Sequence, residues 1–166
     1  MIRSFDGHEP DIHESAYVDP SAVVIGEVEI GKDASVWPNV TIRGDHGKIT
    51  LEEGVNIQDN AVLHEGGHLE PYATVGHGAI VHNCRVGERA LVGMNAVVLD
   101  RATVGEEAMV AANSLVPEGM AVPDSTLVAG TPAEEKRTFE ESPWREAGEV
   151  YVDLARRHRD TSERLD

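Results

Sequence analysis

Aliphatic residues recur every six positions along most of this chain. The series comprises Ile12, Val18, Val24, Ile30, Val36 and Ile42, then Leu51, Ile57, Leu63, Leu69, Val75 and Val81, and after a step of five Val86, Val92, Val98, Val104, Val110, Val116, Val122 and Val128. Small residues follow many of them four positions later, as Ala22 follows Val18. A helix has a period of about 3.6 residues and a strand a period of two, so the pattern indicates a repeat architecture instead.

Each six-residue unit is interpreted as one short strand followed by a corner. Residues that tolerate left-handed backbone, such as Asp33, Asn39 and Gly78, stand three positions after an aliphatic residue, where a corner needs them. Three units form a triangular coil of about 18 residues, and coils stack about 4.8 Å apart. Over residues 10–132 this pattern resembles the hexapeptide-repeat proteins, whose fold is a left-handed parallel β-helix. The left hand is implied by the resemblance, since the general rule for parallel crossovers favours the opposite hand.

The C-terminal part of the chain has a different pattern. The stretch AGTPAEEKR (129–137) resembles the family's exit from the coil, and Ser142 with Pro143 is typical of a helix start. The sequence therefore predicts an all-β fold with a C-terminal helix, in which residues 1–137 form the coil and 138–166 a helix packed on it. The residues at helical spacing that we expect to face the coil are Trp144, Ala147, Tyr151, Leu154, Ala155 and His158. Tyr151 is also a candidate substrate-binding residue.

The net charge narrows the classes of binding partner, and the cysteine content bears on the cell compartment. The formal net charge is −16, from 30 acidic and 14 basic residues, which argues against nucleic acid and anionic membrane surfaces as partners. Acidic excess with few lysines fits a protein adapted to high salt, and an ordinary acidic protein is the alternative. The single cysteine, Cys84, cannot form an internal disulfide. No signal peptide or membrane span is recognisable, so the sequence predicts a cytoplasmic protein.

The length of one coil predicts which side chains stack on one another. His64 and His82 are 18 residues apart and each directly follows an inward aliphatic residue, so they should lie on one edge of neighbouring coils. Two imidazoles at that separation can share a zinc ion. Arg43 is expected below His64 on the same edge.

A third histidine falls on another face of the prism. His77 should stack above Asp59, too far from His64 and His82 to join them within one chain. Two half-sites on either side of a corner favour a cyclic homotrimer, in which the His77 face of one subunit meets the His64 and His82 edge of the next.

These stretches together are similar to the gamma-class carbonic anhydrases and their relatives. The matching residues are TIRGD (41–45), NIQD (56–59), LHE (63–65) and GHGAIVHNC (76–84). The resemblance implies a homotrimer whose interfaces bind zinc, or iron or cobalt in its place, through His64, His77 and His82. It further implies an intersubunit ion pair of Arg43 with Asp59, a water-orienting Gln58, and a surrounding network that contains Asn56 and Asp45.

The activity implied is reversible hydration of CO₂ to bicarbonate by a metal-bound hydroxide. His46 stands where active members carry a glutamate that transfers protons, and it is either a proton shuttle or a plain turn residue. Two other functions stay open. One is hydrolysis of an acyl thioester, which relatives with this site perform; acyl transfer, which many hexapeptide-repeat proteins catalyse, ranks below it because it usually needs one catalytic histidine and no metal triad. The other is a non-catalytic role in a trimeric assembly.

Overall fold

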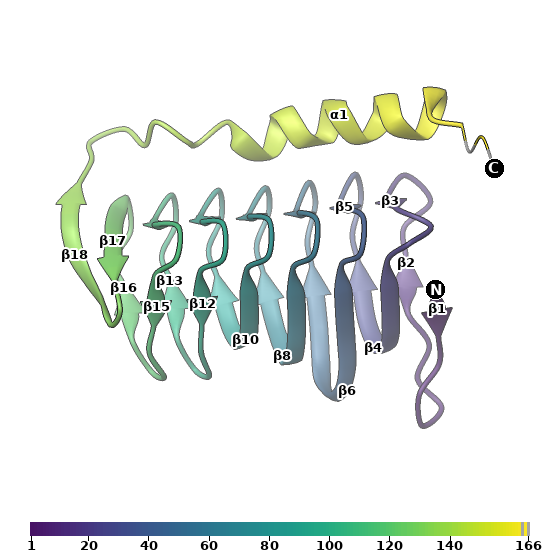
Figure 1. Cartoon of the computed structure of the whole chain (residues 1–166), viewed down its shortest axis with the longest axis horizontal. Helices are drawn as coiled ribbons and strands as arrows, with labels where there is room; N and C mark the ends of the chain where they lie inside the picture. The colour runs from purple at the N-terminus through teal and green to yellow at the C-terminus, as the bar shows by residue number, and fades with distance from the viewer. Residues whose placement is uncertain (164, 166) are drawn as a thin grey trace.

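The chain folds into a prism of stacked coils with one long helix along its side (Figure 1). The structure is a computed structural model that describes residues 1–163 and 165. Helix α1 spans Ala147–Thr161. The predicted fold class, a parallel β-helix of hexapeptide repeats followed by a C-terminal helix, is confirmed.

The strands form two sheets that cover the three faces of the prism. Two faces share a ten-stranded sheet, because several strands run through the corner between them. This sheet contains β1 (Ile2–Arg3), β2 (Asp11–Ile12), β4 (Val23–Ile30), β6 (Thr41–Leu51), β8 (Val62–Leu69), β10 (Ile80–Val86), β12 (Val97–Val98), β13 (Thr103–Val104), β15 (Leu115–Val116) and β16 (Ala121–Val122).

The third face is an eight-stranded sheet on which α1 lies. Its strands are β3 (Tyr17–Val18), β5 (Ser35–Val36), β7 (Asn56–Ile57), β9 (Thr74–Val75), β11 (Leu91–Val92), β14 (Met109–Val110), β17 (Thr126–Gly130) and β18 (Ala133–Thr138). The strand pairs between coils of the described chain are parallel, and β17 pairs with β18 in antiparallel fashion.

The interior of the prism consists of the aliphatic series predicted from the sequence. From Val24 to Val128 every member of the series is at most 3% exposed, and the alanines that follow them are equally buried. The corner residues Asp33, Asn39 and Gly78 have positive φ, as their turn positions require. The six-residue period thus specifies both the core and the corners.

One coil carries extra residues in β6, and they project beside the histidine edge. Arg43 pairs with His64 and Ile49 with Gly67, so five residues separate the paired positions in β6 and only two separate them in β8. This insertion contains Asp45 and His46.

The exit from the coil is a short antiparallel pair, and the helix begins later than predicted. Ser142 was expected to start it, but Ser142 Oγ and Trp144 Nε1 both donate to the carbonyl of Glu107 and hold a turn there. The helix starts at Ala147 with Glu146 as its N-cap. Its second residue, Gly148, lies so close to Tyr72 that a Cβ would stand 2.5 Å from the Tyr72 carbonyl oxygen.

The helix packs on the third face as predicted, over β3, β5 and β7. Ala155 is buried and Tyr151 and His158 are partly buried, while Gly148 and Val152 also face the coil and were absent from the predicted stripe. Among the described residues, no helix has the length and apolarity needed to cross a membrane.

We expect thermal stability to rise steeply with salt, because the net charge of −16 repels itself and screening relieves that repulsion. Exposed ion pairs such as Arg101 with Glu118 weaken in salt, but each contributes at most about 1 kcal/mol. Melting in 0.05–3 M KCl should raise the midpoint by about 10 °C or more, equivalent to a few kcal/mol. Sulfate and chloride at equal ionic strength separate screening from specific ion effects, and an unchanged midpoint would contradict adaptation to high salt.

Candidate metal centre

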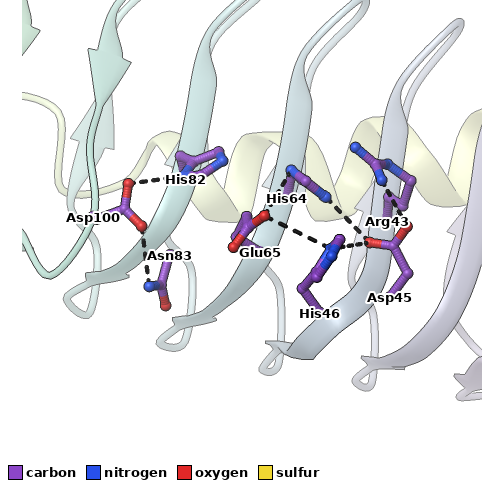
Figure 2. Close-up of polar contacts among 8 residues, drawn as sticks. All are labelled: Arg43, Asp45, His46, His64, Glu65, His82, Asn83 and Asp100. Carbon is purple, nitrogen blue, oxygen red and sulfur yellow. Dashed lines mark hydrogen bonds and ion pairs between the residues drawn. The ribbon is translucent and has the colours of Figure 1, made fainter.

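His64 and His82 lie one above the other on β8 and β10, as the 18-residue coil predicts. The two residues are register partners, and their ring centroids are 5.3 Å apart (Figure 2). Arg43 on β6 is the register partner of His64 on the opposite side. The sequence therefore correctly predicted that Arg43, His64 and His82 stack on successive coils along one edge.

The insertion in β6 places a carboxylate against this column. Asp45 Oδ2 accepts a hydrogen bond from Arg43 Nη1 at 2.6 Å, and Asp45 Oδ1 lies 3.1 Å from His64 Nε2. Partial burial alone raises the pKa of Asp45, but the hydrogen bonds with Arg43 and His64 outweigh it and lower this pKa from 3.8 to about 2. Arg43, expected to pair with Asp59 of another subunit, thus has a partner within its own chain.

A second carboxylate holds His82, and the sequence analysis missed it. Asp100 Oδ2 is 2.9 Å from His82 Nδ1, and Asn83 donates to Asp100 Oδ1 at 3.1 Å. The hydrogen bond from Asn83, followed by that with His82, lowers the pKa of Asp100 despite some desolvation. The coil that follows His82 has 17 residues, since Val81 pairs with Val98, so Asp100 stands one position beyond the register position of His82 and is not reached by counting one coil.

His77 lies two residues after the end of β9, a strand of the third face, and not with the other two histidines. Its Nδ1 is 2.9 Å from Asp59 Oδ2, which confirms the predicted stacking of these two residues. The groups of donor atoms close enough to share an ion in the described chain contain His64 and His82 but not His77.

The predicted amides form a buried chain on the third face. Gln58 Nε2 donates to Asn56 Oδ1 at 3.1 Å, and Asn56 Nδ2 donates to Thr74 Oγ1 at 2.8 Å. Because Asn56 fixes the orientation of the Gln58 amide, the Gln58 carbonyl oxygen is free to accept a hydrogen bond.

A small apolar hollow adjoins these groups. It has a volume of about 250 Å³, and Gln58 and His77 line it together with Leu91, Met94 and Met109. The lining also contains small residues, namely Gly76, Gly93 and Ala112.

Tyr151 lies in an aromatic cluster rather than in the lining of this hollow. Its ring contacts Trp37 edge-on at 5.6 Å between centroids. Burial, followed by the nearby charge of Asp59, raises the pKa of Tyr151. A role of Tyr151 in binding substrate stays a prediction.

The three histidines offer the donor set that zinc prefers. For His77 and His82 the carboxylate engages Nδ1, which leaves Nε2 available as a ligand, and His64 is held through Nε2, which leaves Nδ1. Neutral imidazoles oriented by carboxylates are typical of zinc sites. The residues present therefore fit a metal ion, provided that a second chain supplies His77.

Comparison with known proteins assigns the family. Residues 9–44 match the family described as bacterial transferase hexapeptide (six repeats). The chain is 43% identical to the carnitine operon protein CaiE of Citrobacter koseri over 169 residues, which cover 94% of this chain and 83% of CaiE. This chain belongs to the carbonic anhydrase-like hexapeptide-repeat family. Two solved structures have a TM-score of 0.90 to it.

The solved relatives carry transferase names. A hexapeptide transferase family protein from Anaplasma phagocytophilum is 38% identical, covering 93% of this chain and 96% of its own. A putative acetyltransferase from Bacillus cereus is 33% identical, covering 96% of each chain. Their similarity extends over the whole prism.

Replacing Asp100 with asparagine is expected to weaken metal binding by about 10–100-fold. The carboxylate fixes the proton of His82 on Nδ1, and loss of such a partner has effects of this size on metal affinity. Zinc titration against a competing chelator measures the loss, and ¹⁵N NMR of the imidazole reports the tautomer. Asp124→Asn, at an exposed corner far along the coil, is the control. Unchanged zinc affinity in Asp100→Asn would contradict the assignment.

Proposed function

We propose that this protein is a zinc-dependent carbonic anhydrase whose sites form between the subunits of a homotrimer. The observation that supports it is the division of the histidines, with His64 and His82 on one edge and His77 with Asp59 on another face. Neither half alone has the three protein ligands of a catalytic zinc site, and a cyclic arrangement joins them three times.

A bound divalent cation supplies the chemistry by lowering the pKa of water to about 7, which provides a nucleophile at neutral pH. The protein residues orient that water and the substrate. Gln58, held by Asn56, would accept a hydrogen bond from that water and so direct a lone pair of the water oxygen toward CO₂.

The carboxylates keep the imidazoles oriented during turnover. Asp59 and Asp100 hold Nδ1 of His77 and His82, and Asp45 holds His64. The pKa of Asp45, lowered to about 2, keeps this group ionised at any pH where the protein works, so it acts as a fixed charge and not as a proton carrier. The exposed ring of His46, 3.3 Å from Asp45, is the candidate carrier of protons to solvent.

The test is stopped-flow CO₂ hydration by zinc-, iron(II)- and cobalt-loaded protein in molar salt. Gln58→Ala should lower kcat about 10–100-fold through loss of water orientation, while His68→Ala, on another face, should have no effect. Hydration no faster than buffer with every metal would refute the proposal.

A second candidate function is hydrolysis of an acyl thioester, and the hollow beside His77 favours it. Its volume of about 250 Å³ far exceeds the roughly 30 Å³ share of one water molecule, so it can accept an apolar chain that CO₂ lacks. Acyl-CoA esters of increasing chain length should be hydrolysed best at one length, and Met94→Trp should shorten that optimum. The buried thiol of Cys84, whose pKa burial raises to about 12, is unsuited to act as a nucleophile in either function.

For the cell compartment we propose the cytoplasm, on the basis of the single cysteine, Cys84.

A further inference from the structure

A second group of metal-binding side chains lies beside His64, outside the set of three histidines. It consists of Asp45 and His46 from the insertion in β6 and of His64 and Glu65 from β8 (Figure 2). The donor atoms of Asp45, His46 and His64 all lie within 4.8 Å of one another. Every member of this group belongs to one chain, whereas the proposed catalytic site needs two.

The distances between these donors match a tetrahedral ion. Asp45 Oδ1 is 3.1 Å from His64 Nε2 and 3.3 Å from His46 Nδ1. Zinc bonds of 2.0–2.1 Å place tetrahedral ligands about 3.3–3.4 Å apart, so small shifts would let these three donors share one ion. Glu65 Oε1 is 3.7 Å from His46 Nδ1 and 4.0 Å from Nδ1 of His64, the nitrogen that does not face Asp45, so it becomes a fourth ligand only if its side chain moves toward the other three donors.

The electrostatics also favour a cation. Asp45 and Glu65 contribute two negative charges, and Arg43 contributes one positive charge that is directed at the other oxygen of Asp45. Asp45 Oδ1 therefore stays available to an ion while Arg43 keeps Oδ2. The side chains of His46 and Glu65 are 63% and 36% exposed, which leaves a path for an ion from solvent.

We propose that Asp45, His46, His64 and Glu65 form a second divalent-cation site, complete within one chain, that competes with the intersubunit site for His64. A neutral imidazole has one nitrogen free to bind metal, and the other carries a proton. If Nε2 of His64 binds the second ion, Nδ1 is protonated and cannot serve the first. Excess zinc then inhibits the enzyme, a consequence that rests on the proposed function, whereas the site itself does not.

The second site is tested by measuring metal binding, which needs no measurement of enzyme activity. The double variant His77→Ala/His82→Ala removes two of the three intersubunit ligands and leaves the proposed second site complete. It should bind one Co²⁺ per chain with the intense visible absorption of a tetrahedral ion. Adding His46→Ala or Glu65→Gln should weaken binding at least about 10-fold. His68→Ala, a similarly exposed histidine paired with Glu52, is the matched control.

Two outcomes would overturn the site: no ion bound per chain by the double variant, or binding that His46→Ala and Glu65→Gln leave unchanged. If the double variant does not fold, the single variant His77→Ala replaces it. Co²⁺ binding that His46→Ala leaves unchanged in that background would again overturn the site.

Inhibition is tested separately. Wild-type activity at one equivalent of zinc should fall at least tenfold in excess zinc, and His46→Ala should not show this fall relative to its own rate at one equivalent. Equal inhibition of both proteins would overturn competition at this site. An inactive wild-type protein would refute the proposed function. The existence of the second site would then be decided by the Co²⁺-binding measurement alone.

Discussion

Arg43→Ala is expected to dissociate the proposed trimer and abolish activity together. Arg43 bonds Asp45 within its own chain and is 41% exposed there, so part of its guanidinium is available to Asp59 of a neighbouring subunit. Once the neighbouring subunit covers it, the arginine would neutralise two carboxylates at once, Asp45 of its own chain and Asp59 of the neighbouring subunit. Removing it would leave both of them buried without a cation, at a cost of about 3–5 kcal/mol per interface. That cost corresponds to dissociation constants about 10²–10⁴-fold higher.

Sedimentation velocity over a range of protein concentrations measures this effect. Arg43→Lys keeps the charge but loses the two-pronged geometry, so it should fall between wild type and alanine. Arg85→Ala removes an exposed arginine that pairs with Glu70 on a different face, and it should leave assembly unchanged. An Arg43→Ala protein that remains trimeric at nanomolar concentration would contradict the placement of Arg43 at the interface.

The parts of the site that the sequence predicted are those that depend on the length of one coil. His64 and His82 are separated by one uninterrupted coil, so their stacking follows from the period alone. Asp59 and His77 stack for the same reason. Asp100 lies one position beyond the residue that stacks on His82, because the step of five shortens that coil to 17 residues, so the period alone does not bring its carboxylate to His82.

Other features depend on contacts that no period describes. The insertion in β6 breaks the register, so the direction in which Asp45 and His46 project is not fixed by counting residues. The start of α1 was predicted wrongly because local helix signals at Ser142 compete with hydrogen bonds to Glu107, a residue distant in the sequence. The hollow beside His77 arises where Leu91 and Met109 on successive coils flank glycine, which only the stacked structure brings together.

Two inactive variants are expected to restore each other's activity when assembled together. His77→Ala leaves every proposed interface without its third histidine, and His64→Ala removes one of the two on the opposite edge. Each variant alone should lose CO₂ hydration by at least about 10³-fold, since a two-ligand site holds zinc poorly. In a mixed trimer, one interface can join the intact His77 of a His64→Ala chain to the intact edge of a His77→Ala chain.

The expected recovery follows from random assembly of equal amounts in a cyclic trimer. An interface is complete when its first chain is the His64→Ala variant and its second is the His77→Ala variant, each with a chance of one half, so about a quarter of the sites regain three histidines. The two variants are co-refolded, mixed trimers are confirmed by native mass spectrometry, and CO₂ hydration per trimer is compared with unmixed controls. Activity is the readout because zinc content would also report the single-chain site that contains Asp45 and His46. Mixed trimers with no recovered activity would show that the three histidines do not act across a subunit interface, and the division of the site between His77 and the His64 edge would have to be abandoned.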